Sequence, residues 1–258
     1  MVDSVSSLRQ CRPARYDGAV GTARWQEEKQ ATTSQKTPGD RQGVTTLPRY
    51  IAVEGPIGVG KTSLTRRLAD SFNYDLVLER PEENPFLERF YRNPQQHALA
   101  TQLFFLFQRA RQLQELKQDD LFEPVRVADF LIDKDRLFAR MNLDPDEFGI
   151  YNNVYDHLTI DAPTPDLVIF LQAPTPILLE RIQKRGIAAE QTITADYLEN
   201  LNNAYTEFFH YYDKSPLLIV NSSEIDLVGN DSDYEQLLQQ ILSGLHGVQY
   251  FNPKPTLL

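Results

Sequence analysis

A glycine-rich segment, residues 55–63, has the residue types and the spacing that bind phosphate groups. Glycines let successive backbone N–H groups curve around an anion, and a lysine followed by a hydroxyl residue can reach terminal phosphates and bind a magnesium ion. The segment therefore predicts a site for a nucleoside triphosphate and Mg²⁺. It fits the pattern G-x-x-x-x-G-K-[ST] and reads Gly55, Pro56, Ile57, Gly58, Val59, Gly60, Lys61, Thr62 and Ser63.

The residues on either side of this loop support the same prediction. Residues 51–53 form a short apolar run typical of a buried strand, and residues 63–72 have the composition of a helix. This context makes the pattern specific, because the positive end of the helix dipole then faces the phosphates. An ordinary glycine turn is the weaker alternative. The loop does not identify the acceptor, which could be water, a protein, a nucleotide or a small metabolite.

Apolar runs alternate with helical stretches along the rest of the chain. This alternation predicts a three-layer α/β sandwich of the P-loop NTPase type, with a five-stranded parallel sheet. After the strand at residues 51–53, the other strands are expected at residues 74–78, 125–129, 166–171 and 216–220. Further helices are expected at about 95–117, 134–140, 145–158, 175–186, 194–212 and 233–245, with Thr175 as the N-cap of the helix that begins at Pro176.

Length and composition limit the class of protein. Residues 1–48 lack apolar periodicity and predict a disordered tail, so the folded domain is expected at 49–247, with a C-terminal tail at 248–258. The formal net charge of −10 argues against a nucleic-acid partner. No apolar run is long enough to span a membrane, and the single cysteine, Cys11, suits the reducing cytoplasm.

Polar residues lie where an acceptor could bind. Glu79 and Asp129 are expected at the carboxyl ends of strands, where ligands bind in open parallel sheets. Gln102 and Arg109 are seven residues apart, which places both on one face of the helix at 95–117. Spacing alone favours a solvent-exposed face for this pair.

Five segments carry a family resemblance: GPIGVGKTS at 55–63, LERPEENPFLERFY at 78–91, Gln102 with FFLFQRARQL, VADFLIDKDRLFA at 127–139 and LLERIQKRG at 178–186. Together they resemble the deoxyribonucleoside kinase family, especially its bacterial deoxyguanosine and deoxyadenosine kinases, and this implies a short lid after the helix at 175–186. The resemblance implies ATP-dependent phosphorylation of the 5′-hydroxyl of a deoxyribonucleoside, with a purine as the expected base, in nucleotide salvage. It also implies a homodimer that pairs through the helix beginning near Gln95. A nucleoside monophosphate kinase and a weakly active nucleotide-binding regulatory protein are the alternatives.

The resemblance also implies roles for residues on the acceptor side. Glu79 corresponds to the general base that accepts the proton of the 5′-hydroxyl. Tyr91 and Glu190 correspond to residues that bind the sugar 3′-hydroxyl. Gln102 corresponds to a glutamine that pairs with the base, with Arg109 beside it.

On the donor side, the resemblance implies a group of cations around the transferred phosphate. Lys61, Arg181 and Arg185 are expected to supply them, with Arg185 leading into the lid. Phosphoryl transfer depends on such charge neutralisation. Thr62 and Asp129 are the expected magnesium ligands, although a purely structural role for Asp129 is nearly as good.

Four departures from the family pattern stand out, one of them His97 in place of a frequent tryptophan. Ala128-Asp129-Phe130 stands where most relatives have an acid-Arg-Ser triplet. Lys134 stands where many have a base-contacting aspartate, so the partner of Arg109 is expected to differ. Ile187 replaces a frequent second lid arginine, which predicts a weaker lid and keeps the regulatory alternative open.

Overall fold

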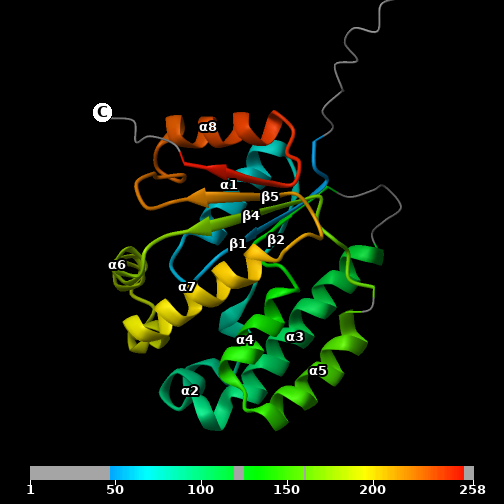
Figure 1. The fold of residues 1–258 in the computed structure, drawn as a ribbon, viewed down its shortest axis with the longest axis vertical. Coiled ribbons are helices and arrows are strands. Elements are labelled where there is room, and N and C mark those ends of the chain that lie inside the picture. Colours follow the sequence, from blue (N-terminus) through cyan, green and yellow to red (C-terminus); the bar gives the residue numbers. More distant parts are fainter. Residues whose placement is uncertain (1–46, 119–124, 160, 253–258) are drawn as a thin grey trace, which may run out of the picture. The chain divides into compact units, whose positions relative to one another are not determined.

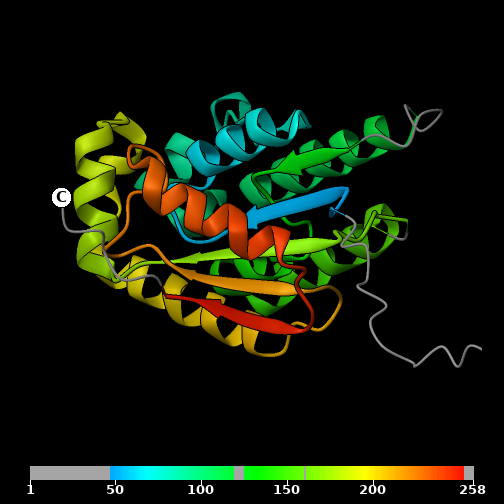
Figure 2. The same cartoon turned by 90° about the horizontal axis from the view of Figure 1, so that it is seen from above.

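A parallel β-sheet lies at the centre of the unit formed by residues 44–258 (Figures 1 and 2). The computed structural model describes residues 47–118, 125–159 and 161–252. The sheet has the strand order β2-β3-β1-β4-β5-β6, and each neighbouring pair is parallel. The predicted disordered tail falls almost wholly outside the described residues.

The elements follow one another in the expected alternation. The strands are β1 (Tyr50–Glu54), β2 (Asp75–Val77), β3 (Arg126–Ala128), β4 (Leu167–Gln172), β5 (Leu217–Asn221) and β6 (Val248–Phe251). The α-helices are α1 (Lys61–Phe72), α2 (Leu87–Arg92), α3 (Pro94–Gln118), α4 (Lys134–Asn142), α5 (Pro145–Thr159), α6 (Thr175–Arg185), α7 (Ala195–His210) and α8 (Asp231–Leu242). The described residues also include the short 3₁₀ helices η1 (Pro81–Glu83) and η3 (Ala188–Thr192).

Helices cover both faces of the sheet, which confirms the three-layer α/β prediction. Figure 1 shows α1 and α8 on one face and α3, α4, α5 and α7 on the other. The central strands β1 and β4 are buried on both faces, and Ile51, Val53 and Val168 have no exposed surface. Burial on both faces explains why these strands are continuous apolar runs rather than alternating ones. Among the described residues, no helix combines the length and the apolar character needed to cross a lipid bilayer.

The sheet has six strands, so the prediction of five is wrong. The additional strand, β6, lies in the segment expected to be a C-terminal tail, and it pairs with β5 from Leu217↔Val248 to Val220↔Phe251. It has four residues at the edge of the sheet, and Val248 and Tyr250 are exposed. A strand this short, with one solvated side, has too little hydrophobic periodicity to be recognised.

Two helix starts differ from the predictions by one or two residues. The start of α6 is Thr175 itself, with Pro174 in the capping position, whereas Thr175 was expected to cap it. The start of α8 is Asp231, because the Asn230 side chain accepts hydrogen bonds from the next N–H groups. Short polar side chains at such positions satisfy the unpaired N–H groups of a first turn.

Candidate active site

A cavity of about 200 Å³ opens at the carboxyl ends of β1, β2 and β3. Its walls come from the glycine-rich loop, from the segment after β2 and from helices on the α3 face of the sheet. This is the edge at which parallel sheets bind ligands. The predicted site residues that line it are Ile57, Gly58, Gly60, Lys61, Thr62, Ser63, Glu79, Tyr91, Gln102, Arg109, Asp129, Arg185 and Glu190.

The glycine-rich loop has a backbone that side chains would obstruct. Gly58 has φ of +85°, and a Cβ there would lie 2.9 Å from the carbonyl oxygen of Leu178. Gly60, with φ of +103°, precedes the first residue of α1, and no described side chain caps that helix. The first N–H groups of α1 are therefore available to an anion, and the helix dipole favours its negative charge.

Lys61 lies against the same loop. Its Nζ donates to the carbonyl oxygens of Gly55 at 2.7 Å and Pro56 at 3.3 Å. Burial lowers the pKa of the Lys61 ammonium, while the nearby Glu54 carboxylate partly opposes that effect. Lys61 thus extends along the loop that the sequence assigns to phosphate.

Thr62 and Asp129 bring two oxygen ligands together at the cavity. The Thr62 Oγ1 donates to Asp129 Oδ2 at 2.6 Å, and Asp129 follows directly after β3. Burial, and then the charge of Glu79, raises the pKa of Asp129. Magnesium is usually held by one or two carboxylates together with substrate phosphates, so this pair fits a Mg²⁺ ion. Among the described residues, no cluster of three histidine, cysteine or carboxylate side chains forms a protein-only metal site.

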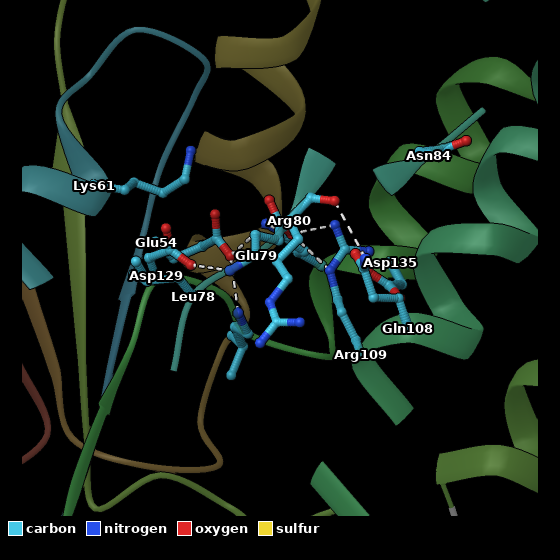
Figure 3. A network of polar contacts seen from close by, with 12 residues as sticks. Glu54, Lys61, Leu78, Glu79, Arg80, Asn84, Gln108, Arg109, Asp129 and Asp135 are labelled. Carbon is cyan, nitrogen blue, oxygen red and sulfur yellow. Dashed lines mark hydrogen bonds and ion pairs between the residues drawn. The ribbon is translucent and has the colours of Figure 1, made fainter. Parts of the chain in front are cut away.

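Glu79 occupies the centre of the polar network shown in Figure 3. It follows β2, and its backbone N–H donates to Asp129 Oδ1 at 2.7 Å. Its Oε1 atom accepts from Arg109 Nε at 2.7 Å and lies 2.9 Å from Lys134 Nζ. Burial alone would raise the pKa of Glu79, but Arg109, Lys134 and Lys61 hold it well below its usual range. The carboxylate is therefore ionised across the physiological pH range.

Gln102 and Arg109 are buried, so the solvent-exposed face favoured by their spacing is wrong. They are 5% and 6% exposed, because α3 packs against α2, α4 and α5. Arg109 bridges Glu79 and Asp135, and Figure 3 shows its guanidinium directed towards both. Burial raises the pKa of Asp135 to about 7, against the opposing charge of Arg109.

The position of Asp135 changes the interpretation of Lys134. By sequence, Lys134 occupies the position where many relatives have a base-contacting aspartate. In the structure, the acid that pairs with Arg109 is the next residue, Asp135. Lys134 contacts Glu79 and, at 3.3 Å, Glu54 Oε2. The pairing of Arg109 was expected to differ from the family pattern, but it is an arginine–aspartate pair, with the aspartate one position later in the chain.

Glu54 is a further site residue that the sequence did not single out. It has no exposed surface, and its Oε1 accepts from Gly55 N at 2.9 Å and Tyr205 OH at 2.8 Å. Its Oε2 accepts from Leu131 N at 3.0 Å. The signal that identified Glu79, an acid at the carboxyl end of a strand, applies equally to Glu54. Tyr205 lies mid-helix on α7 and has no comparable signal.

Tyr91, Arg185 and Glu190 form the outer wall of the cavity. The Arg185 guanidinium pairs with Glu190 Oε2 at 2.5 Å. Burial, with smaller contributions from Tyr197 and Glu190, raises the pKa of Tyr91, so its hydroxyl stays protonated. A phenol that donates and a carboxylate that accepts can together bind a hydroxyl group of a ligand.

The other predicted residues lie beside the cavity. Gly55, Pro56 and Val59 are buried parts of the loop, and Arg181 donates to the carbonyl oxygens of Val59 at 3.3 Å and Ser222 at 2.7 Å. Arg181 is therefore placed to support the loop.

Two further residues that depart from the family pattern are Phe130 and Ile187. Phe130 is fully buried in the core, and Ile187 is 44% exposed.

The sequence and the fold match known proteins throughout the described domain. A profile of the deoxynucleoside kinase family matches residues 51–246. Deoxyguanosine kinase of Bacillus subtilis (strain 168) is 35% identical over 198 residues, which cover 74% of this chain and 95% of that protein. Deoxyadenosine kinase of Lactobacillus acidophilus is 32% identical over 207 residues, with 75% and 94% covered.

A solved structure shows the same relationship. Deoxyadenosine kinase from M. mycoides with bound dATP has a TM-score of 0.65 and 27% sequence identity, covering 74% of this chain and 98% of that one. The resemblance seen in the sequence is confirmed by both comparisons. The chain belongs to the deoxynucleoside kinase family of phosphotransferases.

Proposed function

We propose that the protein transfers the γ-phosphate of ATP to the 5′-hydroxyl of a purine deoxynucleoside, deoxyguanosine or deoxyadenosine, in nucleotide salvage in the cytoplasm. One observation carries the proposal: a single cavity holds the phosphate-binding loop at one end and the Glu79–Arg109 pair with Gln102 at the other. A donor and an acceptor can therefore meet beside one carboxylate. The relatives named for deoxyguanosine and deoxyadenosine support the purine preference.

In this mechanism Glu79 accepts the proton of the 5′-hydroxyl as that oxygen bonds to the γ-phosphorus and the bond to ADP breaks. A carboxylate with a low pKa suffices, because the transition state is largely dissociative and the proton leaves late. Lys61 and Arg185 neutralise the phosphate charge, and Arg181 holds the loop. Thr62 and Asp129 would hold Mg²⁺, which neutralises charge on the phosphates when bound.

On the acceptor side, Tyr91 and Glu190 bind the sugar 3′-hydroxyl, and the Gln102 amide pairs with the edge of the base. A carboxamide offers a donor and an acceptor together, which matches the edge of a purine. A 2′-hydroxyl has no assigned partner in this arrangement. Selection for deoxyribose then depends on the fit of the sugar against Tyr91.

The test is a Mg-ATP assay with the purified protein against deoxyguanosine, deoxyadenosine, deoxycytidine and thymidine, with their monophosphates in parallel. We expect turnover of a purine deoxynucleoside and a loss of about 100-fold or more in Glu79→Gln, the scale of general base catalysis. Turnover confined to monophosphates would instead indicate a nucleoside monophosphate kinase. ATP binding without turnover of any of the four would indicate a regulatory protein.

We also propose a homodimer that pairs through α3 and its neighbour α5. Each of these helices carries an exposed large apolar side chain, Phe107 at 53% and Ile150 at 55% exposure. The two helices pack against each other, so these residues can form one apolar patch. Sedimentation velocity measures the mass in solution: we expect a dimer that Phe107→Glu dissociates, and a monomeric wild type would refute the pairing.

A further inference from the structure

Lys134 is a buried lysine that none of the roles above uses. It is the first residue of α4, and its side chain is 3% exposed. Its Nζ lies 2.9 Å from Glu79 Oε1 and 3.3 Å from Glu54 Oε2. A buried ammonium costs free energy unless carboxylates compensate it, so its position between two acids calls for a physical reason.

Glu54 does not depend on Lys134 for its position. Its Oε1 accepts from the Gly55 N–H and the Tyr205 hydroxyl, and its Oε2 accepts from the Leu131 N–H. Two of these donors are backbone groups, and one of them begins the phosphate-binding loop. Glu54 is therefore a fixed anchor at the end of β1, and Lys134 connects it to Glu79.

The contacts of Glu79 are strongly one-sided. Arg109 and Lys134 both contact its Oε1, and within the described part of the chain no hydrogen bond or ion pair reaches Oε2. Arg109 belongs to α3, on the acceptor side, whereas Lys134 leads through Glu54 to the phosphate-binding loop. The two cations thus hold one oxygen from two sides and leave the other available to a hydroxyl proton.

We propose that Lys134 is a positioning residue for phosphoryl transfer, which fixes the Glu79 carboxylate relative to the phosphate-binding loop and directs Oε2 towards the acceptor hydroxyl. The inference rests on the proposed role of Glu79 as the general base. In-line transfer needs the attacking oxygen and the phosphorus in near-contact alignment, so a small displacement of the base is costly.

Steady-state kinetics of Lys134→Met and Lys134→Arg test this role. Methionine keeps an apolar stem as long as that of lysine up to Cε and removes the ammonium group. We expect kcat to fall by up to about 100-fold, the cost of a misplacement of roughly 1 Å, while the KM for ATP stays near the wild-type value. Arginine keeps a cation and should recover a large part of kcat. Wild-type kcat in Lys134→Met would overturn the proposal.

A second variant separates positioning from simple charge compensation. In Glu54→Gln/Lys134→Met both buried charges are removed, so the double variant leaves no uncompensated acid at Glu54. We expect its melting temperature to recover relative to Lys134→Met while kcat stays low, because Glu79 still lacks its connection. Recovery of kcat in the double variant would show that Lys134 serves only to balance Glu54, and it would decide the question even if Lys134→Met does not fold.

Two controls complete the experiment. Lys214 forms an ion pair with Asp133, the residue that precedes Lys134 in the chain. The Lys214 side chain is 59% exposed. Lys214→Met makes the same change outside the cavity and should leave kcat unchanged. Glu79→Gln separates the two proposals: full activity in that variant refutes the role of Glu79 and the inference together, whereas an inactive Glu79→Gln beside a normal Lys134→Met refutes only the inference.

Discussion

Replacing Arg109 with glutamine should strongly destabilise the fold, because it removes the cation that two buried carboxylates share. The side chains of Arg109, Glu79 and Asp135 are 7%, 17% and 1% exposed. In the variant Glu79 keeps Lys134, whereas Asp135 loses its hydrogen-bonding cation, and its Oδ2 already has no partner among the described residues. Breaking a buried pair in this way costs about 3–5 kcal/mol in the free energy of unfolding.

The loss should depend on pH, with a sign set by Asp135. Burial raises its pKa to about 7, so the unfolded chain releases this proton near pH 4 and the folded chain only near pH 7. Arg109 opposes the shift, so its removal raises the pKa of Asp135 further. Above pH 7 the folded variant therefore retains a proton that the unfolded chain has lost, and each further pH unit costs it up to about 1.4 kcal/mol. Below pH 5 the carboxyl is neutral and the loss is smaller.

Urea unfolding at pH 5 and pH 8 measures this effect. The difference between wild type and Arg109→Gln at each pH cancels the titration of groups common to both proteins. We expect the larger difference at pH 8, and we expect Arg109→Gln/Asp135→Asn to recover part of it, because asparagine carries no charge to leave unpaired. A difference below about 1 kcal/mol at pH 8, the size of an exposed ion pair, or equal differences at both pH values, would refute the reasoning.

Two further predictions concern the donor side. Gly58→Ala should reduce ATP affinity, measured by isothermal titration calorimetry, and cost about 1–3 kcal/mol of stability, because its backbone is left-handed and its Cβ would meet Leu178; an unchanged affinity would mean that the loop adopts another path. Tyr205→Phe should cost about 1.5–3 kcal/mol in urea unfolding, because it removes a 2.8 Å hydrogen bond to the buried Glu54 carboxylate and keeps the ring; a smaller loss would indicate that another donor replaces the hydroxyl.

The donor side could be predicted from sequence because one continuous segment specifies it. Residues 55–63 need no distant partner to form the loop, and the strand and helix that flank it are strongly patterned. The alternation of elements likewise predicted the layers. The elements that could not be predicted are short or exposed on one side. An example is β6, whose four residues show no clear hydrophobic period.

The acceptor side could be predicted only in part, because its geometry depends on how helices pack. Lys134 and Asp135 are neighbours in the chain, but consecutive residues of a helix point about 100° apart. One therefore meets Glu79 and the other meets Arg109. The rotation of α4 about its axis decides which residue faces which partner, and packing against α3 sets that rotation. Spacing within α3 likewise placed Gln102 on one face with Arg109 but could not reveal that other helices cover that face.

The cavity has no excess of positive charge from its buried side chains. The cavity and its polar network contain three cations, Lys61, Arg109 and Lys134. They also contain four carboxylates, Glu54, Glu79, Asp129 and Asp135. Even with Asp135 protonated, the two sets only balance. A triphosphate brings several further negative charges. Besides Lys61, we expect the N–H groups at the start of α1, the half-exposed Arg185 and a Mg²⁺ ion beside Thr62 and Asp129 to neutralise them. Arg109 and Lys134 hold the protein's own acids in place, so we expect turnover to depend on Mg²⁺.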